Sequence, residues 1–150
     1  MNPVSQLAET TLRKPVAEPL VFESAEESPL AMAILEAMSD ATSRTILNSI
    51  VAVGRSIEEI TLVSGVPIST TYRRVHELCQ KGLIIVERIV ISNGGKRHSI
   101  YRSAFRGATI EVEFDRIRLE GLPNDAVPDI TFRLWQFAES HREPPLSEHV

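Results

Sequence analysis

The sequence predicts an α+β fold: four short helices, a β-hairpin, and then an additional C-terminal strand and helix. Three observations predict it. Apolar residues recur at helical spacing between residues 29 and 81, β-branched residues dominate from residue 83 to 103, and an Asn-Gly-Gly triplet interrupts that second stretch. Because the chain has 150 residues, 43% of them hydrophobic and 24% charged, we expect one main domain with an appendage.

Residues 1–28 show no sustained hydrophobic period. Two internal prolines, Pro15 and Pro19, and scattered acidic residues leave too little apolar surface to offset the entropy of ordering the chain. We therefore expect a mobile N-terminal tail over residues 1–28, a main domain over residues 29–106, and a C-terminal strand and amphipathic helix over residues 107–150 as the element of dimerisation.

Two helices open the main domain. Ser28 followed by Pro29 is a typical helix start. The apolar face of the first helix consists of Leu30, Ile34, Leu35 and Met38. After Ser39 and Asp40, a second helix is expected to stop near Gly54, and its apolar face consists of Ile46, Leu47, Ile50 and Val51.

A tight turn joins the next two helices. Ser56 and Glu59 have the spacing of a capping box, which satisfies two backbone donors at the start of a third helix ending near Ser64. Gly65 supplies a left-handed residue, and a fourth helix follows over residues 68–81. Its predicted inward stripe consists of Ile68, Thr71, Val75 and Leu78.

The rest of the chain is mainly extended. Residues 83–92 and 97–103 are predicted to pair through a turn at Asn93-Gly94-Gly95, which places basic residues at the hairpin tip. Residues 110–114 alternate apolar and acidic side chains, which indicates a further strand with a bulge or bend near Asp115. After a linker over residues 122–128, Asp129 is expected to cap a terminal helix. That helix either packs on the core or meets a second copy of the chain.

The formal net charge of -4 conceals a basic centre between two acidic ends. Residues 44–106 contain ten Lys and Arg side chains against four Glu, whereas the flanking segments are dominated by acids. A local excess of positive charge is what binding to a phosphate backbone requires.

A helix, a tight turn, a second helix and a basic hairpin form a winged helix-turn-helix arrangement, which predicts sequence-specific binding to double-stranded DNA. The fourth helix would enter the major groove and the wing, residues 92–99, would lie on the backbone. Arg73 is the first candidate for a base contact, and Ser69 and Thr70 approach base edges or hold a phosphate. Tyr72 either stacks on the DNA or packs against the third helix. The predicted phosphate contacts are Arg44, Arg74, Lys96, Arg97 and His98, although Arg44 fits an exposed salt bridge equally well.

The same region resembles the ArsR-like winged-helix repressors. The resemblance lies in residues 35–47, 59–60, 64–75, 78 and 81–83, and it covers roughly residues 30–103. It implies a homodimeric DNA-binding transcriptional regulator in which the fourth helix reads the sequence and the hairpin is the wing. The acidic strand over residues 107–119 departs from the family pattern, in which the terminal helix follows the wing directly, so the dimer geometry is left open.

Other functional classes find little support. The third helix lacks the paired cysteines of metal-sensing members, and the four histidines show no metal-ligand spacing, so we expect no metal, no cofactor and no enzymatic activity. Cys79 is the single cysteine, which excludes an intrachain disulfide and favours a cytoplasmic protein. No apolar run is long enough to cross a membrane.

Two alternatives remain open at this point. Winged helices also serve as protein-protein adaptors that read no DNA, and the acidic flanks would suit a basic partner. A sensor that responds to a ligand or to redox state would have to use Cys79 or the aromatic terminal helix. The sequence identifies no small-molecule effector.

Overall fold

Helices and strands alternate in blocks, as the predicted α+β class requires. The structure is a computed structural model that describes residues 17–140. In chain order its elements are β1 (Leu20–Phe22), η1 (Ala25–Glu27, a 3-10 helix), α2 (Pro29–Ser39), α3 (Ala41–Ser49), α4 (Ile57–Ser64), α5 (Ile68–Gln80), β2 (Ile84–Ile91), β3 (Arg97–Ser103), β4 (Phe105–Val112), β5 (Ile117–Pro123) and α6 (Ile130–Ser140). The α+β class is confirmed.

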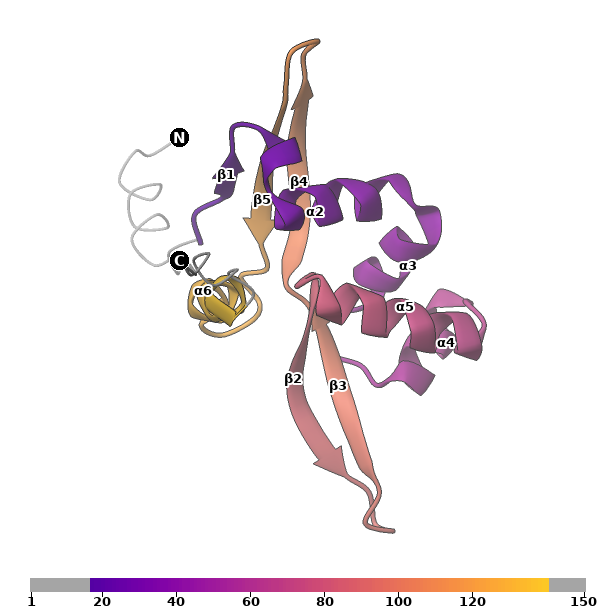
Figure 1. The fold of residues 1–150 in the computed structure, drawn as a ribbon. Coiled ribbons are helices and arrows are strands. Elements are labelled where there is room, and N and C mark those ends of the chain that lie inside the picture. The colour runs from indigo at the N-terminus through magenta and orange to yellow at the C-terminus, as the bar shows by residue number, and fades with distance from the viewer. Residues whose placement is uncertain (1–16, 141–150) are drawn as a thin grey trace, which may run out of the picture.

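Two antiparallel hairpins, β2–β3 and β4–β5, point in opposite directions along the molecule (Figure 1). Only Ala104 separates β3 from β4, so the two strands form a nearly continuous path between the hairpins. Helices α2–α5 lie on one side of this path, and β1 and α6 lie on the other. The scaffold therefore holds the β2–β3 hairpin beside α4 and α5.

The core lies where the helices meet the junction of the two hairpins. Every helix from α2 to α6 contributes at least two buried apolar side chains to it. Its larger members are Ile34, Ile46, Leu47, Ile50, Ile57, Ile60, Val75, Leu78, Leu83, Ile84, Tyr101, Phe105, Leu119, Ile130 and Leu134.

The N-terminal segment corrects the expectation of a mobile tail over residues 1–28. Leu20–Phe22 pair with β5, with Leu20 opposite Gly121 and Phe22 opposite Leu119. Ala25 is fully buried in η1. The open edge of β5 supplies backbone partners, and burial of Leu20 and Phe22 against the core offsets the cost of ordering. Residues 1–16 lie outside the described part of the chain.

The segment after the first hairpin holds two strands where one was expected. The predicted bulge near Asp115 is the tip of a hairpin, in which the Glu113 amide donates to the Arg116 carbonyl at 2.9 Å. The strand β5 then runs to Pro123, into the region expected to be a linker. A bulge does occur, but it lies between Phe105 and Gly107.

Helix α3 ends at Ser49, earlier than the predicted stop near Gly54, because other groups take the carbonyls that would continue it. Arg102, only 7% exposed, donates from Nε to the Val51 carbonyl and from Nη2 to the Ala52 carbonyl. The buried Asn124 amide also donates to the Val51 carbonyl, at 2.8 Å. These bonds tie the end of α3 to the sheet.

Helix α6 packs on the core by one face only. Ile130 and Leu134 are buried. The Phe137 ring packs against Gly82 so closely that a Cβ added to Gly82 would lie only 2.6 Å from Cε1 of Phe137. Asp129 was expected to cap α6. Its φ of 55° is left-handed, whereas a usual N-cap residue has an extended backbone. No helix in the described residues is long and apolar enough to span a membrane.

Candidate nucleic-acid interface

Helices α4 and α5 are joined as the sequence predicts. The Glu59 amide donates to Ser56 Oγ at 3.2 Å, and the Ser56 amide donates to the Glu59 carboxylate at 3.4 Å, which completes the capping box. Gly65 has a φ of 75° and closes α4 with a bond from its amide to the Thr61 carbonyl. The turn thus fixes where α5 begins.

Helix α5 has one buried and one exposed face. Thr71, Val75 and Leu78 are buried, and the Thr71 hydroxyl donates to the Pro67 carbonyl at 3.1 Å. Ile68, predicted to point inward, is 55% exposed because it stands at the first turn, beyond the core. The exposed side chains are Ser69, Tyr72, Arg73, His76, Glu77 and Gln80, and Thr70 is half-buried.

The β2–β3 hairpin carries the other predicted cations. Its tip closes through bonds from the Ser92 amide to the Lys96 carbonyl and from the Gly95 amide to the Ser92 carbonyl, with Gly95 at a φ of 77°. Lys96 and Arg97 are exposed and His98 is half-buried. The turn that Asn93-Gly94-Gly95 predicted is therefore confirmed.

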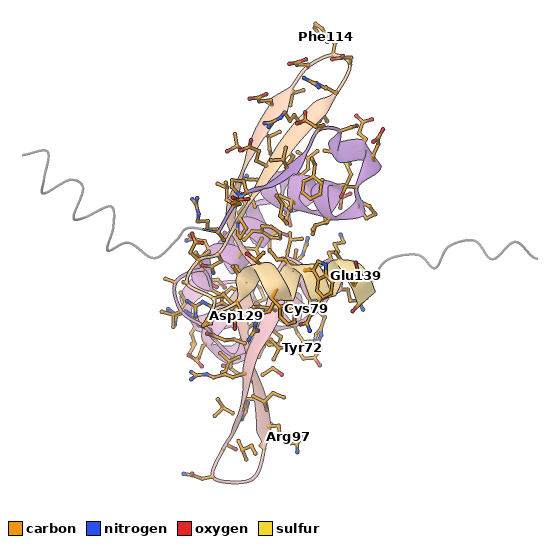
Figure 2. The ribbon with its side chains drawn as sticks, turned by 90° about the vertical axis from the view of Figure 1, so that its left-hand side faces the viewer. Tyr72, Cys79, Arg97, Phe114, Asp129 and Glu139 are labelled. Carbon is orange, nitrogen blue, oxygen red and sulfur yellow. The ribbon has the colours of Figure 1, made fainter. Side chains whose placement is uncertain are left out.

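A groove of about 500 Å³ separates α5 from the hairpin. Figure 2 shows Arg97 on the projecting hairpin and Tyr72 nearer its base. The rings of Tyr72 and His76 lie 4.5 Å apart, and Glu58 supplies a carboxylate on the α4 side. Four of the side chains that the sequence predicted as DNA contacts line this groove: Tyr72, Lys96, Arg97 and His98.

The cations divide into those with partners and those without. Arg102, Arg116 and Arg118 each form ion pairs in the scaffold. Within residues 17–140, five cationic side chains have neither a hydrogen bond nor an ion pair: Arg73, Arg88, Lys96, Arg97 and Arg106. Four of these five belong to α5 and the β2–β3 hairpin, and two of the four, Lys96 and Arg97, line the groove.

Arg74 differs from the other predicted phosphate contacts because its side chain has partners within the domain. Its Nη1 donates to Asp40 Oδ2 at 2.7 Å and to Ser43 Oγ at 3.3 Å, and its Nε lies 3.8 Å from Glu77. Hydrogen bonding from Ser43, with the charge of Arg74, holds the pKa of Asp40 below its usual value, although partial desolvation opposes the shift. Arg74 thus joins α5 to the start of α3, and its role as a phosphate contact stays a prediction.

Arg44 also lies apart from the groove. Its Nη1 donates to the Met38 carbonyl at 2.6 Å, at the end of α2. The alternative expected for Arg44 was an exposed salt bridge, but its partner in the structure is this carbonyl oxygen. Conversely, sequence reasoning did not select Arg88 as a contact. It lies on β2 just after the register shift between Val86 and Arg88, a feature that only strand pairing reveals.

The remaining reactive groups offer little chemistry. Burial raises the pKa of the Cys79 thiol to about 11, so the reactive thiolate is scarce at neutral pH. Within the described residues, no group of three or more His, Cys, Asp and Glu side chains is placed to hold a metal ion. The comparisons add no functional lead, since no family model and no curated protein matches the chain.

Proposed function

We propose that the protein is a sequence-specific, double-stranded DNA-binding transcriptional regulator of the winged-helix class. The observation that carries the proposal is that α5 and the β2–β3 hairpin hold four cationic side chains with no partner within residues 17–140, and that two of them, Lys96 and Arg97, line the open groove between these elements. Cations without acidic partners remain free to replace the counterions of a phosphate backbone. The resemblance of residues 30–103 to ArsR-like regulators supports the same proposal.

In this proposal α5 enters the major groove. An α-helix fits that groove, and an exposed arginine there can contact guanine O6 and N7 together, with about 1–3 kcal/mol of discrimination. Arg73 suits this role because it stands on the exposed face of α5 and has no partner among the described side chains. Ser69 lies in the first turn of the same helix, where backbone amides favour a phosphate.

The β2–β3 hairpin then lies along the backbone. Lys96 and Arg97 extend beyond the body of the molecule, so they reach phosphates that α5 does not. Contacts of this kind supply affinity without sequence information. A homodimer would place two α5 helices roughly 34–36 Å apart, which predicts a two-fold symmetric site.

Binding of two duplexes by fluorescence anisotropy tests the proposal. One duplex is selected from a random pool by the protein itself, and the other has a scrambled sequence. We expect Arg73→Ala to weaken binding to the selected duplex about tenfold or more and to change the scrambled duplex little. Replacing Lys96 and Arg97 together by Ala should weaken both alike and reduce the dependence on salt.

Arg116→Ala is the matched control, because Arg116 lies on the opposite hairpin and pairs with Glu23 and Glu113. It should bind both duplexes as the unmodified chain does. Selection that returns no enriched sequence, or affinity unchanged by all these substitutions, would overturn the proposal.

An adaptor that binds another protein is the second candidate function. The observation in its favour is the apolar side chains that β2 exposes, among them Ile89 and Ile91. An adaptor of this kind would retain its affinity for a protein partner after Lys96 and Arg97 are neutralised, and it would retard no duplex at moderate salt.

A further inference from the structure

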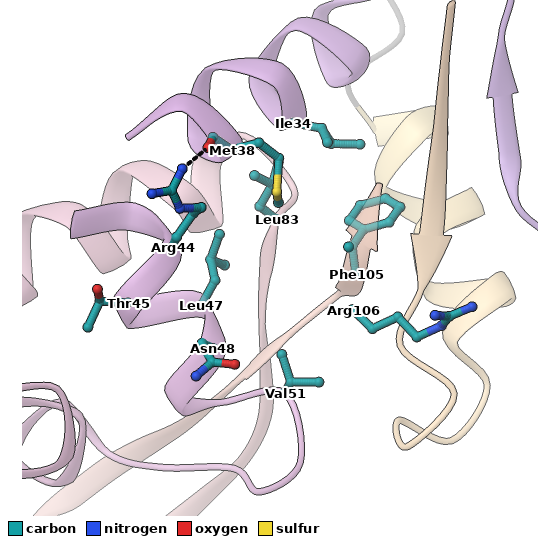
Figure 3. A pocket seen from close by; sticks show the side chains of 11 residues that line it. Ile34, Met38, Arg44, Thr45, Leu47, Asn48, Val51, Leu83, Phe105 and Arg106 are labelled. Carbon is teal, nitrogen blue, oxygen red and sulfur yellow. Dashed lines mark hydrogen bonds between the residues drawn. The ribbon is translucent and has the colours of Figure 1, made fainter. Parts of the chain in front are cut away.

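A second cavity, of about 430 Å³, lies away from the α5 groove, between α2, α3 and β4 (Figure 3). Cavities of this size match small-molecule sites, which are concave, mostly apolar and carry a few placed polar groups. This cavity is open on one side, so a ligand can enter without unfolding the domain. No side chain described around the α5 groove takes part in it.

The interior of the cavity is apolar. Its walls are formed by the core-facing sides of two helices and by the ring at the start of β4. The apolar lining side chains are Ile34, Met38, Leu47, Val51, Leu83 and Phe105. Because Asn48 and Thr45 are the only uncharged polar side chains in the described lining, the interior favours the hydrocarbon part of a ligand.

The charged lining side chains are both arginines, Arg44 and Arg106, and the described lining contains no Asp or Glu. They lie on opposite sides of the cavity, and the Arg106 side chain extends outward, away from Arg44 (Figure 3). The two differ in how their charge is used. Arg44 donates to the Met38 carbonyl at 2.6 Å, at the negative end of α2. Arg106 is exposed and has no partner within residues 17–140. One cation is therefore available to an anionic ligand.

The backbone places Arg106 at this rim. The β-bulge in β4 leaves Arg106 without a partner residue on β5, since Phe105 pairs with Pro123 and Gly107 pairs with Leu122. Bulges redirect side chains and are frequent beside binding sites. Gly107, which also lines the cavity, has no atom within 4 Å of the place where a Cβ would stand. The bulge thus sets a cation beside open space and an apolar floor.

We infer that this cavity binds a small monocarboxylate with an apolar body. The carboxylate pairs with the Arg106 guanidinium, whose planar fork matches its two oxygens, and the hydrocarbon part lies against Met38 and Val51, the half-buried apolar side chains of the lining. An inorganic anion would leave the apolar lining without a partner, so the ligand needs a hydrocarbon part. A single unpaired guanidinium matches a ligand with a single negative charge. The lining of the cavity shares no residue with the groove beside α5, and the inference is tested without DNA.

Isothermal titration calorimetry with the full chain and three eight-carbon probes tests the inference. The probes are octanoate, 1-octanol and octylamine, all below the concentrations at which they form micelles. We expect octanoate to bind most tightly, 1-octanol more weakly and octylamine most weakly. Arg106→Ala should weaken octanoate about tenfold or more and leave 1-octanol unchanged, whereas Arg44→Ala should have little effect on either.

Gly107→Leu adds a bulky side chain to the lining and should weaken binding of both octanoate and 1-octanol. Gly94→Leu is the matched control, because Gly94 also has open space around its Cβ position and lies in the β2–β3 turn. Equal affinity for the three probes, or unchanged octanoate binding in Gly107→Leu, would overturn the site. An Arg106→Ala variant that weakens duplex binding but not octanoate would assign Arg106 to the DNA interface instead.

Discussion

Asp40 is a residue on which two helices depend. Its carboxylate caps α3 by accepting from the Ser43 amide at 3.2 Å, and it accepts from Arg74 of α5 at 2.7 Å. The carboxylate thus sets the position of α5 relative to α3, while the capping bond by itself orders only the first turn of α3. Its charge therefore matters beyond α3.

A pH series of unfolding free energies measures this contribution. The pKa of Asp40 is lower in the folded chain than its usual value of 3.8, so its stabilising effect is present above that value and is lost as pH falls through the folded pKa. Asp40→Asn keeps the capping ability but removes the charge. We expect the variant to be less stable than the unmodified chain near neutral pH and the difference to vanish well below pH 3.8. A difference that persists unchanged in acid would contradict the role of the charge.

Arginines show what a sequence can and cannot predict about single residues. The local excess of positive charge correctly identified the segment that carries the unpaired cations. It did not separate Arg102, which binds backbone carbonyls, or Arg74, which pairs with Asp40, from Arg73, whose side chain has no partner in the described part of the chain. Asp40 lies 34 positions from Arg74, and the Ala52 carbonyl lies 50 positions from Arg102, so no local pattern marks these partners.

At the scale of elements, α4 depends on its N-terminal cap. Ser56 is buried and both bonds of the capping box are formed, so its hydroxyl satisfies the Glu59 amide, which has no partner within the helix. Ser56→Ala should lower the free energy of unfolding by about 0.5–2 kcal/mol in chemical denaturation. Ser39→Ala is the control, because the exposed Ser39 hydroxyl only donates to the Glu36 carbonyl, and it should change stability by less than about 0.5 kcal/mol. If Ser56→Ala and Ser39→Ala lowered the free energy of unfolding equally, Ser56 would have no special role as a cap.

Elements with local signals were predicted well and those without them were not. Caps, a left-handed glycine and an Asn-Gly-Gly turn fixed α2, α4, α5 and the β2–β3 hairpin to within a few residues. The β4–β5 tip contains no glycine or asparagine, so its turn was mistaken for a bend. Strand β1 is stabilised only by pairing with β5, about a hundred residues later, which no local pattern reports.

For the molecule as a whole, α6 and β1 define the side opposite to the helical body. An apolar hollow of about 370 Å³ lies between them, lined among others by Leu20, Leu134 and Trp135. Phe132 and Trp135 are 57% and 58% exposed, and their rings stack at 6.0 Å. One face of α6 therefore packs on the core of its own chain, while this aromatic pair is exposed. The helix can thus pack on the core and also contact a second copy of the chain, which are the two roles that the sequence left open.

The outward pair leads to the prediction for the assembled protein. If α6 meets a second copy, Phe132→Ser with Trp135→Ser removes apolar area from the contact but leaves Ile130 and Leu134 in the core, so the fold should persist while the dimer dissociates. Sedimentation velocity should then change from a dimer to a monomer, and affinity for a two-fold symmetric duplex should fall at least tenfold. Phe114→Ser, at the fully exposed tip of the β4–β5 hairpin, should leave both measurements unchanged. A chain that is monomeric at micromolar concentration before any substitution would exclude α6 as the dimer contact and would leave each α5 to read a single half-site.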